Sequence, residues 1–126
     1  MMPPLSDHAF NTWLQTTKDT LSRQIEGFLA SLSLPSGLQQ AIHYAVFSGG
    51  KRLRPLTLLA VADTYNIPRE KTHALAVSLE LMHAYSLVHD DLPGMDNDCY
   101  RRGSPTVHIA FDHATAILVG DALQAL

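Results

Sequence analysis

The sequence predicts an all-α protein, and three observations support that fold class. Apolar residues recur at three- and four-residue steps through several long segments, which is the helical pattern. Prolines and a glycine pair separate these segments, as they commonly separate helices. No run alternates apolar and polar residues in the way that indicates a half-buried strand.

The first two helices have clear boundary signals. Apolar residues follow the helical spacing through residues 10–32, so the first helix is expected to be capped by Ser6 or Asp7 and to end before Pro35. A second helix is expected over about residues 36–47, because the glycine pair that follows favours a turn.

The third and fourth helices are expected to follow closely. The third starts near Lys51, tolerates Pro55 in its first turn and runs to about Tyr65. The fourth runs over about residues 68–91, and its middle is apolar nearly all round. Such a helix is expected to be surrounded by protein.

The remaining residues are expected to form a loop and a last helix. Prolines and glycines punctuate residues 92–105, which predicts a loop. A final helix is expected to begin near Asp112 and to run toward Leu126.

Composition limits the class of protein. The chain has 126 residues, of which 46% are hydrophobic and 17% charged, so one globular domain over residues 1–126 is expected. With 9 Lys and Arg against 12 Asp and Glu, the net charge is −3. This balance argues against a nucleic-acid binder or a protein of anionic membrane surfaces, so any anion site must be local.

The cellular compartment is expected to be the cytoplasm. Cys99 is the single cysteine, so no disulfide can form within the chain. The first residues lack the apolar run of a signal peptide, and no stretch approaches the roughly 20 apolar residues of a membrane span.

Four carboxylates gather at the end of the fourth predicted helix: Asp90, Asp91, Asp96 and Asp98. Their mutual repulsion and the negative end of the helix dipole make this placement unfavourable without a counter-ion. Mg²⁺ prefers one or two carboxylates together with water and phosphate oxygens, so it would suit the cluster. The alternative is a solvated acidic turn.

Two basic clusters accompany the acids. Arg101 and Arg102 follow in the same loop, and Lys51, Arg52 and Arg54 come directly after the glycine pair. Glycines and cations at a helix N-terminus form a ready anion site, although a solvated basic turn is the simpler interpretation.

One histidine stands apart from the others. His83 lies seven residues before Asp90, close to two turns along the same helix face, and Glu80 lies one turn earlier. His83 is either a site residue or an ordinary core histidine. The other histidines show no metal-binding spacing and are expected to be structural: His8, His43, His73, His89, His108 and His113.

These segments, in this order, resemble the trans-prenyltransferase (polyprenyl synthetase) family, most closely its bacterial farnesyl and geranylgeranyl diphosphate synthase type. The matching segments are Gly49–Pro55, Glu80–Asp98, Arg101–Gly103 and Gly120–Gln124. The resemblance implies the isoprenoid-synthase helical fold and a homodimer. It also implies a Mg²⁺-dependent, head-to-tail condensation of isopentenyl diphosphate with an allylic diphosphate, dimethylallyl or geranyl.

The resemblance also assigns residues. Asp90 and Asp96 match the family's Mg²⁺ ligands, with Asp91 in support, and Arg101 matches the arginine that binds the allylic diphosphate. Catalysis would therefore depend on Asp90, Asp96 and Arg101. The groups expected to hold isopentenyl diphosphate are Lys51, Arg54, His83 and Arg102.

Length is the main departure from the family pattern. Family members are more than twice as long, and their second aspartate-rich motif would lie beyond Leu126. We therefore expect the N-terminal part of such an enzyme, inactive alone. The alternatives are a non-catalytic remnant or partner subunit, and a helical interaction module.

Product length is left open between fifteen and twenty carbons. Tyr85 lies five residues before Asp90, about 7.5 Å along a helix. Its ring could form part of the floor of the product cavity, or it could simply belong to the core.

Cys99 stands where the family often has another acid.

Overall fold

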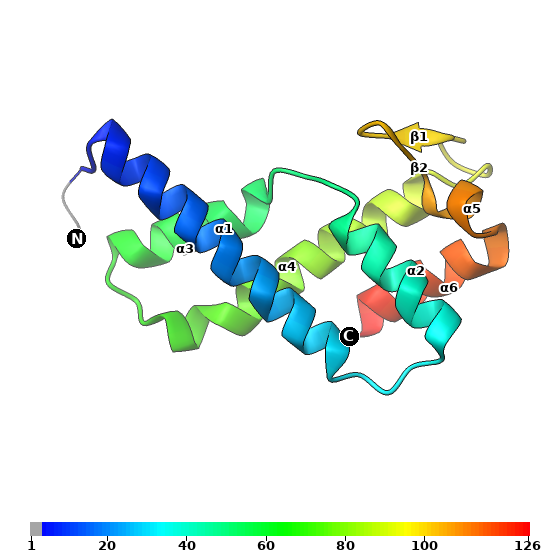
Figure 1. Cartoon of the computed structure of the whole chain (residues 1–126), viewed down its shortest axis with the longest axis horizontal. Coiled ribbons are helices and arrows are strands. Elements are labelled where there is room, and N and C mark those ends of the chain that lie inside the picture. Colours follow the sequence, from blue (N-terminus) through cyan, green and yellow to red (C-terminus); the bar gives the residue numbers. More distant parts are fainter. Residues whose placement is uncertain (1–3) are drawn as a thin grey trace. The chain divides into compact units, whose positions relative to one another are not determined.

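The computed structural model describes residues 4–126, and helices dominate it (Figure 1). The described chain contains six helices and one two-stranded hairpin. Its residues group into two compact units. The first unit contains the residues up to 31 and residues 52–80, and the second contains residues 32–51 and 81–126.

The first unit is built from α1 (Asp7–Ala30), α3 (Leu53–Thr64) and the N-terminal half of α4 (Arg69–Asp90). Ser6 caps α1 by accepting a hydrogen bond from the amide of Ala9, as expected. Helix α1 packs on α3 (Figure 1). The buried core residues of these two helices recur at helical spacing: Leu21, Ile25, Leu29, Leu56, Leu59 and Ala62.

A polar cluster fastens the three helices of this unit. The carboxylate of Asp63 on α3 accepts a hydrogen bond from Trp13 Nε1 on α1 at 2.7 Å. It also accepts two from Arg69 on α4, from Nε at 2.8 Å and from Nη2 at 2.6 Å. The Arg69 hydrogen bond, opposed by burial and helped by Trp13, lowers the pKa of Asp63 below its ordinary value of 3.8.

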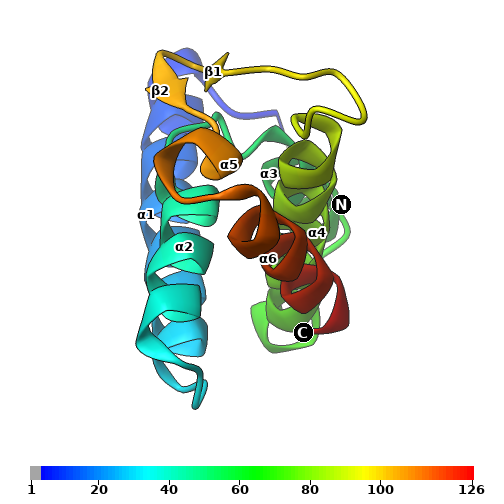
Figure 2. The ribbon, with the colours of Figure 1, turned by 90° about the vertical axis from the view of Figure 1, so that its right-hand side faces the viewer.

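The second unit contains α2 (Ser36–Phe47), the C-terminal half of α4, α5 (Val107–Ala110) and α6 (His113–Ala125). Helix α6 packs against both α2 and α5 (Figure 2). Asp112 caps α6 by accepting a hydrogen bond from the amide of Thr115. The core residues of α2 and α6 are Ala41, Ile42, Val46, Ala116, Val119 and Leu123.

The predicted all-α class is confirmed, but two small elements of the second unit were not predicted. Strands β1 (Tyr100–Arg101) and β2 (Ser104–Pro105) form an antiparallel hairpin inside the expected loop. Two-residue strands are too short to show an alternating pattern, and the four residues of α5 are too short to show a helical one.

The expectation that protein surrounds the fourth helix is wrong for the described chain. The stripe of α4 that carries Lys71, Leu75, Ser78 and Met82 is open to solvent, and there Leu75 is 58% and Met82 46% exposed. The buried side of the helix carries Ala76, Leu81, Ala84 and Val88. Apolar character all round shows that burial is favourable, but only covering elements can supply it, and none of the described elements covers this stripe.

No membrane span was expected from the sequence. Across residues 4–126, no helix has both the length and the apolar character to cross a membrane.

Candidate functional site

The acidic segment folds back over the end of α4. The amide of Asp96 donates to the carbonyl of Asp90 at 2.8 Å, and the amide of Asp98 donates to the carbonyl of Asp91 at 3.1 Å. Pro93 and Gly94 lie in the turn between these paired positions. The backbone therefore returns Asp96 to the end of the helix that carries Asp90.

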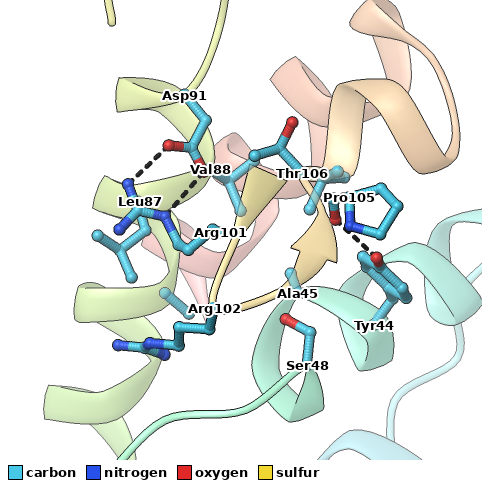
Figure 3. A pocket seen from close by; sticks show the side chains of 12 residues that line it. Tyr44, Ala45, Ser48, Leu87, Val88, Asp91, Arg101, Arg102, Pro105 and Thr106 are labelled. Atoms are coloured by element: carbon cyan, nitrogen blue, oxygen red, sulfur yellow. Dashed lines mark hydrogen bonds and ion pairs between the residues drawn. The ribbon is translucent and has the colours of Figure 1, made fainter. Parts of the chain in front are cut away.

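Asp91 differs from its neighbours because it is buried and already paired. Its carboxylate accepts two hydrogen bonds from Arg101 of β1, from Nε at 3.0 Å and from Nη2 at 2.6 Å (Figure 3). This bidentate pair raises the pKa of Arg101, against the effect of burial, and the charges of Asp98 and Asp90 add to the rise. Asp91 therefore orients Arg101, while Asp96 is exposed to solvent and Asp90 partly so.

The acidic turn offers carboxylate oxygens, a donor type that suits a hard divalent cation. Within the described part of the chain, no three His, Cys, Asp or Glu side chains come together as a metal-binding group. Asp90 and Asp96 share one turn, and Mg²⁺ prefers one or two carboxylates together with water and phosphate oxygens, so these two residues would hold it.

Arg102, the second arginine of the hairpin, contacts the glycine pair Gly49–Gly50. Its Nη1 donates to the carbonyl oxygen of Gly49 at 3.0 Å. A Cβ on Gly50 would lie 2.5 Å from the same nitrogen, and Gly49 and Gly50 have φ values of 114° and 125°. Both positions favour glycine because of their positive φ, and at Gly50 the guanidinium of Arg102 would also have to shift to admit a Cβ.

The other predicted site residues lie on separate elements. Lys51 is exposed and directly follows the glycine pair that Arg102 contacts. His83 lies partly buried on α4, within the same unit. Arg54 is exposed in the first turn of α3 and belongs to the first unit. The structure thus brings Arg101 to Asp91, and Arg102 to the loop that precedes Lys51.

A small cavity of about 30 Å³ lies among these groups (Figure 3). That volume suits about one water molecule. Its polar wall comes from Tyr44, Ser48, Asp91, Arg101 and Arg102, and α2 and α4 supply apolar side chains. Tyr44 on α2 also donates from its hydroxyl to the carbonyl of Pro105 on β2 at 2.6 Å.

The hairpin that carries both arginines is therefore held at several points. Asp91 binds Arg101, the Gly49 carbonyl binds Arg102, and Tyr44 binds the second strand. Thr106, just beyond the hairpin, donates from its hydroxyl to the carbonyl of Asp98 at 2.7 Å. Arg101 and Arg102 are thus presented from a supported element.

His89 and Gly120 form a contact that the sequence did not predict. Nε2 of His89 donates to the carbonyl oxygen of Ile117 on α6 at 3.1 Å. A Cβ on Gly120 would lie 2.0 Å from this nitrogen, so only glycine leaves room for the ring. Through this hydrogen bond, His89 joins the end of α4, next to Asp90, to α6. The signal in the sequence that could have indicated this contact is a glycine inside an otherwise apolar helix.

The chain matches known proteins over most of its length. The family model described as Polyprenyl synthetase matches residues 35–126. The chain is 42% identical to the farnesyl diphosphate synthase of Bacillus subtilis, over 89% of this chain and 38% of that protein. It is 44% identical to the farnesyl diphosphate synthase of Haemophilus influenzae, over 92% of this chain and 40% of that protein.

Solved structures give the same relationship. A geranyltransferase from Legionella pneumophila superposes with a TM-score of 0.89 at 44% identity, over 91% of this chain and 41% of that one. The geranyltranstransferase of Thermotoga maritima gives a TM-score of 0.84 at 35% identity, over 89% of this chain and 42% of that one. The chain spans about two fifths of the length of these relatives.

The matched region contains the glycine loop, all of α4, the acidic loop, the hairpin with its two arginines and Gly120. Every element of the site described above therefore lies inside the family match. The chain belongs to the polyprenyl synthetase family.

Proposed function

We propose that this chain is the N-terminal part of a short-chain prenyl diphosphate synthase of the farnesyl type, here called the parent enzyme. The parent would condense isopentenyl diphosphate with dimethylallyl or geranyl diphosphate. The observation that carries the proposal is the Asp90–Asp96 turn beside Arg101, which a buried Asp91 orients. The farnesyl diphosphate synthases among the relatives support it, although the chain spans only about two fifths of their length.

The acidic turn and Arg101 would act on the allylic substrate. Asp90 and Asp96 would hold Mg²⁺, which when bound supplies Lewis-acid stabilisation of the departing diphosphate. Two N–H groups of Arg101 are occupied by Asp91, so its remaining donors would bind diphosphate oxygens. Fixed donors of this kind stabilise the charge that develops as the allylic C–O bond breaks.

The basic residues would bind the second substrate. Lys51, Arg54, His83 and Arg102 are proposed to hold the diphosphate of isopentenyl diphosphate. Its double bond would then donate an electron pair to the allylic cation, forming the new C–C bond. A proton is lost afterwards, in the proposal to the released diphosphate. Apolar side chains of α4 would help to keep water from the cation.

The assembly and the compartment belong to the same proposal. We expect the parent to be a homodimer in the cytoplasm, and its size by light scattering tests the first expectation. The alternative to an active synthase is a non-catalytic remnant or a partner subunit of a prenyl synthase.

Product analysis tests the proposal directly. The purified parent is incubated with dimethylallyl diphosphate, labelled isopentenyl diphosphate and Mg²⁺, and the products are separated by chromatography. We expect prenyl diphosphates of fifteen or twenty carbons, no product when the metal is chelated, and no product from the 126-residue chain alone. A folded parent that leaves both substrates unchanged would favour the remnant or subunit.

A further inference from the structure

The basic segment after the glycine pair contains one arginine that is turned into the protein. Arg52 is only 9% exposed, whereas Lys51 before it and Arg54 after it are exposed. Nη1 of Arg52 donates to Oε1 of Glu80 on α4 at 2.6 Å, and both side chains are buried. The segment therefore offers a ligand fewer cations than its sequence suggests.

The backbone at Arg52 is also unusual. Arg52 has φ 55° and ψ 32°, the left-handed conformation, which costs a non-glycine residue about 1–2 kcal/mol. It stands immediately before α3, and its carbonyl accepts the hydrogen bond from the amide of Leu56 that starts the helix. The conformation of this one residue therefore sets the direction in which the chain enters α3.

The ion pair is poorly suited to be a simple stabiliser. Burying two charges costs several kcal/mol per ion, and well-packed apolar residues often stabilise a fold as well or better. In addition, Oε2 of Glu80 is buried and has no hydrogen-bond partner among the described residues. What the pair does supply is a fixed inward direction for Arg52, because Glu80 holds its guanidinium at 2.6 Å between two buried side chains.

We propose that Glu80 is a positioning residue for isopentenyl diphosphate. By holding Arg52 inside in the left-handed conformation, it turns Lys51 and Arg54 outward at the start of α3. The inference rests on the proposed function, in which Lys51 and Arg54 bind that substrate. Glu80 acts through Arg52 and does not contact the substrate.

The proposal predicts a selective effect. Arg101 of the allylic site has its own support, the buried Asp91, which lies in the other unit. Loss of the Arg52–Glu80 pair should therefore weaken the binding of isopentenyl diphosphate and leave the allylic substrate unaffected. A merely structural role would change both substrates together.

The test uses the parent enzyme with both partners replaced. The double variant Arg52→Met with Glu80→Met removes the pair without leaving a lone buried charge. We expect a Tm near that of the unaltered enzyme, a KM for isopentenyl diphosphate raised about tenfold or more, and an allylic KM within about twofold. Hydrogen exchange at the Leu56 amide, which bonds to Arg52, should also become faster.

A matched control separates stability from positioning. Arg69→Met breaks another ion pair of the same unit, Asp63–Arg69, which shares no residue with the basic segment. It should lower the Tm without changing either KM. If the double variant does not fold, Glu80→Gln, which keeps the shape and one acceptor oxygen, is measured in the same way.

Two results would overturn the proposal: an unchanged KM for isopentenyl diphosphate in a folded variant, or an equal rise of both KM values. In either case, turnover by the unaltered enzyme leaves the proposed function intact. An unaltered enzyme without turnover refutes the proposed function and, with it, this inference.

Discussion

Replacing Gly120 by alanine tests whether α4 is seated on α6 through His89. The added Cβ would lie 2.0 Å from Nε2, 2.2 Å from Cδ2 and 2.6 Å from Cε1 of the His89 ring. Ordinary contacts begin near 3.4 Å, so the ring must move by more than an ångström. That movement breaks its hydrogen bond to the carbonyl of Ile117.

The expected cost follows from three contributions. Overpacking typically costs about 1–3 kcal/mol, and the lost hydrogen bond about 0.5–1.5 kcal/mol. Alanine is better than glycine inside a helix by about 1 kcal/mol, which offsets part of this cost. We therefore expect the free energy of unfolding to fall by about 0.5–3.5 kcal/mol, as measured by urea denaturation followed by circular dichroism.

Gly27 provides the matched control for this substitution. It lies inside α1, and a Cβ there would meet nothing within 4 Å. Gly27→Ala should therefore stabilise the chain by up to about 1 kcal/mol. Adding His89→Ala to Gly120→Ala removes the clash, so the double variant should be less unstable than the two single effects together predict. If Gly120→Ala is as stable as Gly27→Ala, the contact with His89 does not constrain α6.

Three further predictions concern the acidic turn, the product and the first unit. In steady-state assays of the parent, Asp90→Ala should lower kcat at least about a hundredfold, whereas Asp98→Ala should change it by less than about tenfold. Comparable small losses in both variants would indicate a solvated acidic turn. Tyr85→Ala should lengthen the products seen by chromatography, and an unchanged distribution in an active variant would remove Tyr85 from the cavity floor. The folded-state pKa of Asp63 lies below its ordinary value of 3.8, so the stability that the ionised Asp63 gives the fold is complete above pH 3.8 and is lost as pH falls through the lowered pKa. Asp63→Asn should therefore flatten this part of the acid-denaturation curve. An unaltered curve would contradict the assignment.

The helices were predictable because their boundaries are local signals. Ser6 and Asp112 cap α1 and α6, and the glycine pair follows α2, so each of these ends could be read from neighbouring residues. The third and fourth helices also fall within a few residues of their expected limits. The uncovered stripe of α4 could not be predicted, because burial depends on which other elements are present.

The pairings within the site were not predictable in the same way. Sequence spacing does not indicate which of two nearby arginines turns inward, and Arg52 and Arg54 stand two residues apart with opposite outcomes. The partners of Arg52 and Arg101, Glu80 and Asp91, are set by tertiary packing. The roles given by the family resemblance to Lys51, Arg54, His83, Asp90 and Asp96 stay predictions until the parent is assayed.

The charge of a sequence cluster therefore differs from the charge that a ligand meets. Asp91 pairs with Arg101, and Arg52 pairs with Glu80, so the acidic cluster and the basic cluster after the glycine pair each have one member in an internal ion pair. Because burying the Arg52–Glu80 pair costs desolvation energy, we infer that its role is to orient Arg52. Both acids lie on or directly after α4, so this helix would orient Arg101 of the hairpin and Arg52 before α3. Variants that remove Glu80 or Asp91 should accordingly separate the two substrates in their KM values, each affecting one diphosphate more than the other.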